Sequence, residues 1–124
     1  MNFQRLILSA IIACVITPCW SKPKARFLGM KKGRVDKITF LAAQDLQLAD
    51  NKDSLWEILS YEFNYSCNGA IVMKAYKSSK IPREILTMVK NCNQPTVADF
   101  RRIMGRNRKS GKIIQLNDIM LTVE

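Results

Sequence analysis

The chain contains no histidine in any of its 124 positions. The Ser-His-Asp and Cys-His arrangements that activate a nucleophile need an imidazole as general base, so this chain does not use them. Many catalytic and structural metal centres also depend on imidazole ligands. The lack of histidine therefore excludes the commonest hydrolase chemistries and the common histidine-based metal sites.

Cysteine is scarce as well, with four residues in the whole chain. Cys14 and Cys19 belong to an N-terminal segment that we expect to be removed, which leaves Cys67 and Cys92. In an oxidising compartment these two are predicted to form one disulfide, and the alternative is a pair of reduced structural thiols. Two cysteines without histidine are too few for a tetrahedral zinc site, so we predict no metal and no cofactor.

Long apolar runs are limited to residues 6–16, which are too short to span a bilayer, since that takes ~20 residues. Arg5 precedes this run, Pro18 ends it and small residues lead up to Lys22, a pattern typical of a signal peptide covering residues 1–21. The alternatives are a buried N-terminal helix or lipidation of Cys19. The basic residues that follow the run oppose translocation. We predict export, to a bacterial periplasm or cell envelope or to the extracellular space.

Acidic residues are absent from two segments, 22–34 and 101–112, which together hold twelve of the twenty basic residues. The segment between them, 35–100, has seven basic and eight acidic residues. The formal net charge of +10 is therefore concentrated in two places, and concentrated cations attract anionic partners. We predict a flexible basic arm over 22–34, followed by a single α+β domain over 35–124.

Apolar spacing predicts three or four short helices. Residues 36–50 fit a helical face, although they also alternate like a strand. Ser54 and Glu57 have the spacing of a capping box at the start of a helix to about Phe63. A third helix follows Pro82 and turns Cys92 toward the core. A fourth begins near Thr96 and carries the basic residues of the second cationic segment.

The remaining segments predict a small antiparallel sheet. Residues 70–76 follow an Asn68-Gly69 turn and read as a buried strand. Residues 112–124 read as a C-terminal hairpin about Asn117-Asp118, because that register places the apolar residues on one face. We expect the first strand to join this hairpin, since an isolated hairpin is only marginally stable.

The fourth helix and the loop after it form the candidate binding site. One helical face is apolar, so the opposite face would hold cations in a defined direction. Such a cluster suits an acidic protein or an anionic glycan, lipid headgroup or nucleic acid. The predicted binding residues are Arg101, Arg102, Arg106, Arg108, Lys109 and Lys112. The alternative is a solvated helix face without a partner.

No catalytic residues are predicted. Glu57 and Glu62 point to different sides of the expected helix, which does not suit a paired acid and base. The leading interpretation is a non-enzymatic, exported interaction protein. The alternatives are a histidine-free toxin or nuclease, and a cationic secreted signalling ligand, for which glycosylation of Asn64 in the Asn-Tyr-Ser sequon would be an indication.

Overall fold

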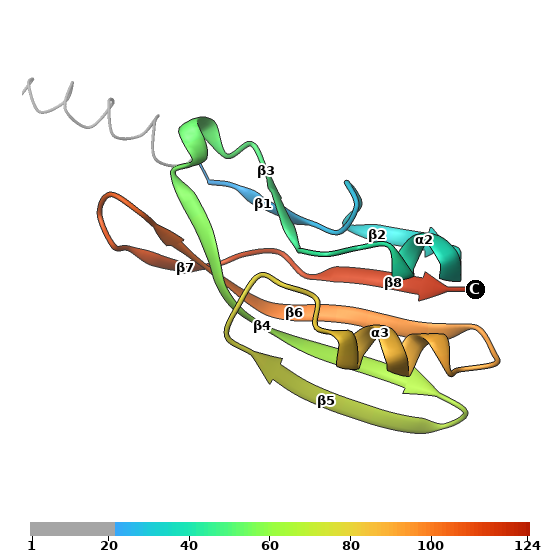
Figure 1. The fold of residues 1–124 in the computed structure, drawn as a ribbon. Coiled ribbons are helices and arrows are strands. Elements are labelled where there is room, and N and C mark those ends of the chain that lie inside the picture. The colour runs from blue at the N-terminus through green and yellow to red at the C-terminus, as the bar shows by residue number, and fades with distance from the viewer. Residues whose placement is uncertain (1–21) are drawn as a thin grey trace, which may run out of the picture.

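The structure is a computed structural model that describes residues 22–124, and Figure 1 shows its ribbon. The predicted signal peptide, its cleavage before Lys22 and the lipidation considered at Cys19 involve residues 1–21, which lie outside the described residues. The elements, in chain order, are β1 (Lys24–Arg26), β2 (Lys32–Val35), α2 (Lys37–Leu41), β3 (Gln47–Ala49), the 3-10 turn η1 (Lys52–Ser54), β4 (Trp56–Cys67), β5 (Ala70–Tyr76), α3 (Arg83–Lys90), β6 (Thr96–Asn107), β7 (Ile113–Gln115) and β8 (Ile119–Val123).

A six-stranded sheet forms the body of the molecule, in the order β2-β8-β6-β4-β5, with β7 also paired to β6. All its pairings are antiparallel except that of β2 with β8, which is parallel. The long strand β6 is central, because β4 lies along one side and β8 and β7 follow one another along the other. A separate ribbon pairs β1 with β3. No helix among residues 22–124 is long and apolar enough to cross a membrane.

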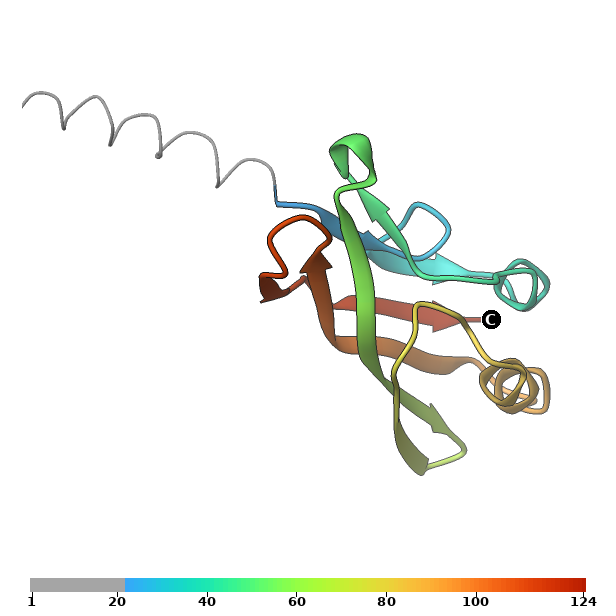
Figure 2. The ribbon, with the colours of Figure 1, turned by 60° about the vertical axis from the view of Figure 1, so that its left-hand side comes forward.

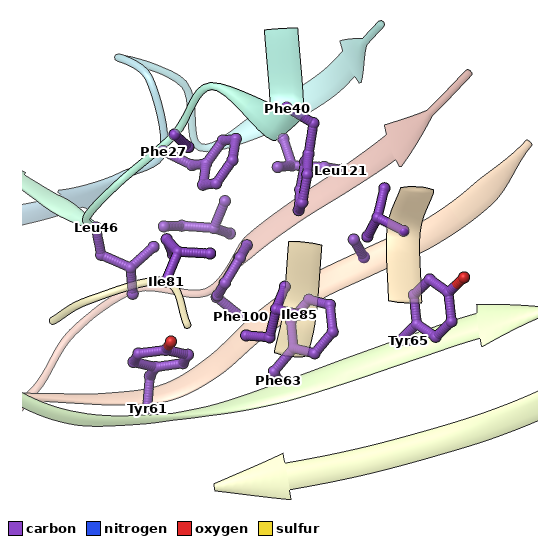
Figure 3. Packing of buried hydrophobic residues seen from close by; sticks show 14 of the residues in the cluster. Phe27, Phe40, Leu46, Tyr61, Phe63, Tyr65, Ile81, Ile85, Phe100 and Leu121 are labelled. Carbon is purple, nitrogen blue, oxygen red and sulfur yellow. The ribbon is translucent and has the colours of Figure 1, made fainter. Parts of the chain in front are cut away.

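The core lies on one face of the sheet, which we call the inner face, under α2, α3 and the β1–β3 ribbon (Figures 1 and 3). Aromatic rings form its centre: Phe27, which follows β1, stacks on Phe40 of α2 at 4.8 Å and on Phe100 of β6 at 5.4 Å. Phe100 in turn contacts Phe63 of β4 at 5.2 Å. Because all four rings are fully buried, they join the N-terminal segment to the sheet.

The predicted disulfide between Cys67 and Cys92 is confirmed. It joins the end of β4 to the chain just after α3, where Cys92 is buried. The helix predicted after Pro82 is also confirmed as α3, and its buried residues Ile85 and Val89 face the core. The Asn68-Gly69 turn is present too: both residues have positive φ, which is the conformation of a tight type I′ hairpin turn.

The predicted α+β fold is wrong, because strands predominate in the described residues and α2 and α3 are the α-helices among them. Of the helix expected over 54–63, Ser54 ends the 3-10 turn η1 and the residues from Trp56 on belong to β4, and the helix expected from Thr96 is β6. The predicted capping box does not form, since the Glu57 carboxylate instead accepts hydrogen bonds from Arg106. Residues 36–50 contain both alternatives considered, a short helix α2 and a short strand β3.

Two irregularities in the pairing of β4 with β6 explain these errors. The register shifts between Ile58 and Ser60 and again between Ser60 and Glu62. At the second shift β6 advances three residues while β4 advances two, so β6 contains an extra residue between Arg101 and Met104. In β4 the buried residues Trp56 and Tyr61 are therefore five apart, and in β6 Phe100 and Ile103 are three apart. Neither spacing is the strict alternation of a regular strand, and a spacing of three also fits the 3.6-residue period of a helix.

The predicted C-terminal hairpin is also wrong. β7 and β8 do not pair with each other, and each pairs with β6 instead. Residues 116–118 only interrupt what is otherwise one path along β6, and the Leu116 amide donates to the Ile103 carbonyl at 2.7 Å. Asn117 is used elsewhere, because its side chain bonds to the backbone of Ala25 in β1. The turn that does form lies between β6 and β7, in the segment expected to be a loop.

Two further expectations need correction. Residues 70–76 do form a strand, β5, with the predicted bounds, but β5 is an exposed edge strand paired with β4. Residues 22–34 are not a free arm in the structure. They contribute β1 and β2, and Ala25 and Phe27 are fully buried, which ties this segment to the core.

Candidate binding face

The side of the six-stranded sheet opposite the core is not covered by any described helix, and we call it the outer face. Strand alternation assigns its side chains, because core-facing and outward-facing residues alternate along each strand. Large apolar side chains are exposed on it, from Ile71 and Met73 on β5 to Val97 on β6 and Met120 on β8. The arginines near the middle of β6 lie one row further along the sheet, where Arg101 is opposite Glu62 of β4.

The extra residue of β6 is Arg102, whose φ is +49°, in the left-handed region that non-glycine residues rarely adopt. This bulge places Arg101 and Arg102, although consecutive in sequence, both on the exposed side, while Phe100 and Ile103 on either side of them are fully buried. In a regular strand one of the two arginines would point into the core. The bulge therefore concentrates two guanidinium groups at the centre of the outer face.

The two arginines differ in how they are held. The guanidinium of Arg101 donates to the carboxylate of Asp99 at 3.2 Å. Asp99 is buried, and its other carboxylate oxygen has no hydrogen-bond partner among the described residues. Arg102 forms no ion pair with a described residue. Arg101 is thus partly committed to a structural contact, whereas Arg102 is available to a ligand.

Shallow hollows on the outer face surround this pair. One, of about 590 Å³, lies over β4, which separates β5 from β6, with Glu62, Arg102 and Gln115 among its lining residues. A second, of about 450 Å³, also includes Arg102, together with Arg101, Ile71 and Met73. Both hollows combine apolar side chains with cations, so the surface suits a ligand that carries apolar and anionic groups together.

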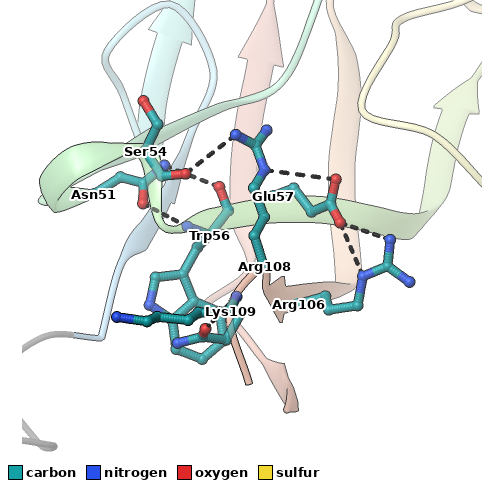
Figure 4. A network of polar contacts seen from close by, with 8 residues as sticks. Asn51, Ser54, Trp56, Glu57, Arg106, Arg108 and Lys109 are labelled. Carbon is teal, nitrogen blue, oxygen red and sulfur yellow. Dashed lines mark hydrogen bonds and ion pairs between the residues drawn. The ribbon is translucent and has the colours of Figure 1, made fainter. Parts of the chain in front are cut away.

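The other predicted cations lie at the far end of β6, around the β6–β7 turn (Figure 4). Arg106 donates two hydrogen bonds to the Glu57 carboxylate, at 2.8 and 2.6 Å. Arg108 lies 3.7 Å from the same carboxylate and donates to the Ser54 carbonyl at 3.1 Å. These two arginines therefore connect β6 and the turn to η1 and β4. Lys109 and Lys112 are exposed in the turn itself.

The six predicted binding residues are thus brought into two groups rather than onto one helix. Arg101 and Arg102 lie on the outer face, and Arg106, Arg108, Lys109 and Lys112 lie at the turn end. Sequence reasoning missed the apolar part of the face, namely Ile71, Met73, Val97 and Met120. A strand over 70–76 places Ile71 and Met73 on the same side, but that strand was expected to be buried, so their exposure was not predicted.

The tyrosines and glutamates offer little for catalysis. Burial raises the pKa of Tyr61 and of Tyr76 far above the usual value, so both phenols stay protonated. The Tyr61 hydroxyl also donates to the Lys80 carbonyl at 2.5 Å. Glu57 is held by two arginines, and Glu84 accepts from Lys74 and Tyr76, which lowers its pKa. Among residues 22–124, no three acidic or cysteine side chains gather as metal ligands.

Comparison with protein-family models finds no match for this chain, and comparison with curated proteins finds no relative.

Proposed function

We propose that this chain is an exported, non-enzymatic binding protein whose outer face docks on an acidic protein partner, with Arg102 at the centre of the contact. The observation that carries the proposal is the β6 bulge. It holds Arg101 and Arg102 side by side on an uncovered sheet face, in a backbone conformation that costs energy. Strained positions of this kind concentrate at functional sites.

An acidic protein suits this face better than a polymer of phosphates or sulfates. Protein interfaces place apolar side chains and arginine at the centre, and Met73, Ile71 and Arg102 line such a surface. Interfaces for nucleic acid are much more positive. Here Glu62 and Asp118 line the same hollow as the arginines, which reduces its positive potential. Carboxylates of a partner would pair with the arginines through charge-assisted hydrogen bonds.

Export is supported by the apolar run before Lys22 and is compatible with the disulfide, which persists in oxidising compartments. Intact-mass measurement of the protein purified from its producing cell tests this part. The expected mass is that of a chain that starts at Lys22 and has both thiols oxidised. An unprocessed chain with free thiols would contradict export.

The binding proposal is tested with two substitutions of Arg102. Arg102→Asn removes the charge and keeps a residue that tolerates positive φ, and Arg102→Glu reverses the charge. Arg83→Glu is the matched control, because Arg83 is exposed on α3, which covers the opposite face. Loss of one charged hydrogen-bonding group is worth about 1.5–3 kcal/mol, so both Arg102 variants should bind about 10- to 100-fold more weakly.

The partner is captured by cross-linking in the native compartment, and its affinity is then measured with purified components. Wild type and the Arg83 variant should bind an acidic protein equally, with affinity that falls as salt rises. Equal binding by the Arg102 variants contradicts the proposal. So does a ligand that proves to be heparin-like glycan, nucleic acid or anionic vesicles, since these would be held by charge alone.

A further inference from the structure

The exposed edge of the main sheet is formed by β5, and nothing among the described residues lies outside it (Figures 1 and 2). An edge strand presents unpaired backbone N–H and C=O groups, which proteins normally protect with charges, proline, bulges or a short strand. β5 has seven residues in unbroken register with β4, and it contains no proline. Its one charged residue, Lys74, is already paired with Glu84 at 2.8 Å.

The opposite edge of the sheet is protected. β2 has four residues, two of which are Lys32 and Arg34, and Gly33 adopts a φ of +130°. A short, cationic and irregular edge of this kind discourages pairing with another strand. The two edges therefore differ, and only β5 has the features of an interaction site.

The hairpin geometry decides which groups of β5 are free. The two-residue turn closes on the pair Cys67 and Ala70, so these residues exchange hydrogen bonds and alternate residues beyond them do the same. The backbone groups of Ile71, Met73 and Ala75 consequently point away from β4. Their side chains lie on the outer face, where Ile71 is 73% and Met73 is 62% exposed.

We propose that β5 pairs antiparallel with β5 of a second copy of this chain, about a two-fold axis at Met73. In this register Met73 lies opposite Met73 of the partner subunit, and Ile71 lies opposite Ala75 of the partner subunit. All three positions carry free backbone groups, so the three pairs exchange about six hydrogen bonds. The exposed apolar side chains of the two strands then cover one another on the outer face.

Charge and symmetry favour a second copy over a different chain. In the centred register Lys74 lies opposite Val72 of the partner subunit, so no like charges face each other directly. Because β2 is protected, the joined sheet ends after two copies, which gives a closed dimer rather than a fibre. This inference does not rest on the acidic partner proposed above, although Ile71 and Met73 belong to both contacts.

The test measures the oligomeric state by sedimentation equilibrium, on the full chain as the cell processes it, from roughly 10 µM to 1 mM, since pairing of single strands buries little area. Met73→Lys places two lysines opposite each other at the axis and should raise the dimer dissociation constant on the order of tenfold. Met120→Lys is the matched control, because Met120 is exposed on the same face but lies on β8, away from the edge. Salt should strengthen the dimer by screening the net positive charge, whereas it weakens an acidic complex.

Amide hydrogen exchange gives a second measurement that needs no variant. Dimerisation should selectively slow exchange at Ile71, Met73 and Ala75, whose amides are free in the monomer, and leave Val72 and Lys74 unchanged because they already pair with β4. A chain that stays monomeric throughout this range overturns the proposal. A dimer that survives Met73→Lys, that Met120→Lys weakens as much, or that leaves these three amides unprotected also overturns it.

Discussion

The consecutive arginines of β6 should respond to substitution with opposite signs. Arg102 occupies the left-handed region at a φ of +49°, which costs an L-residue about 1–2 kcal/mol. Glycine adopts this conformation freely, although its greater backbone entropy in the unfolded chain takes back about 0.5–1 kcal/mol. Arg102→Gly should therefore increase the free energy of unfolding by about 0.5–1 kcal/mol, while it weakens binding to an acidic partner.

Arg101→Ala should instead lower the free energy of unfolding. Asp99 has a side chain only 11% exposed, and Arg101 is its ionic partner at 3.2 Å. Removing the guanidinium leaves a nearly buried carboxylate without a partner, which typically costs about 1–3 kcal/mol. Arg101 itself is half-exposed, so solvent compensates in part and the expected loss is about 1–2 kcal/mol.

Urea unfolding with the disulfide intact measures both effects, and Arg83→Ala is the surface control, with an expected change within about 0.5 kcal/mol. In thermal unfolding, each kcal/mol corresponds to about 4–8 °C in a domain of this size. A destabilised Arg102→Gly variant would show that the bulge conformation carries no strain. Equal losses at Arg101 and Arg102 would show that the Asp99 contact does not distinguish them.

Three other outcomes follow from the structure. Replacing both Cys67 and Cys92 by alanine should lower the free energy of unfolding by about 3.5 kcal/mol in the chain-entropy model, since the bridge closes a separation of 25 residues; a loss below about 1 kcal/mol in urea unfolding would contradict this estimate. Lys74 and Tyr76 lower the pKa of Glu84 below its usual 4.5, so its contribution is complete above that pH and is lost as pH falls through the lowered value. The melting temperatures of wild type and Glu84→Gln should accordingly differ at pH 7 and converge in acid, and a constant difference would refute the assignment. Glu57→Gln should loosen the β6–β7 turn, visible as faster amide exchange at Arg108, whose amide donates to the Leu55 carbonyl at 2.8 Å; unchanged exchange would show that the arginine contacts do not hold the turn.

The locally determined parts of the fold were predictable. The Asn68-Gly69 turn, the bounds of β5 and the helix after Pro82 all follow from short stretches of chain. The disulfide partners followed from the cysteine count, which leaves one possible pair after residue 21. A turn depends on which residues tolerate positive φ, and a helix start depends on a residue that lacks an amide donor. Neither requires knowledge of the distant neighbours.

The long strands were not predictable in the same way. In β4 the buried residues Trp56, Tyr61, Phe63 and Tyr65 do not alternate regularly, because the register shift inserts a step. In β6 the spacing of three between the buried residues Phe100 and Ile103 comes from the second register shift. A spacing of three satisfies a helix as well as a bulged strand, and local periodicity cannot tell the two apart.

The candidate site depended on the bulge in β6. Composition and charge order decided that cations would gather in two segments, because charge is a property of the residues themselves. The face on which these cations lie was decided only when β4 and β6 paired, because the bulge puts Arg101 and Arg102 on one face. Pairing of β7 and β8 with β6, rather than with each other, then fixed the other side of β6. Pairing between distant strands sets which side of a sheet each residue occupies, and a shift of one residue reverses it.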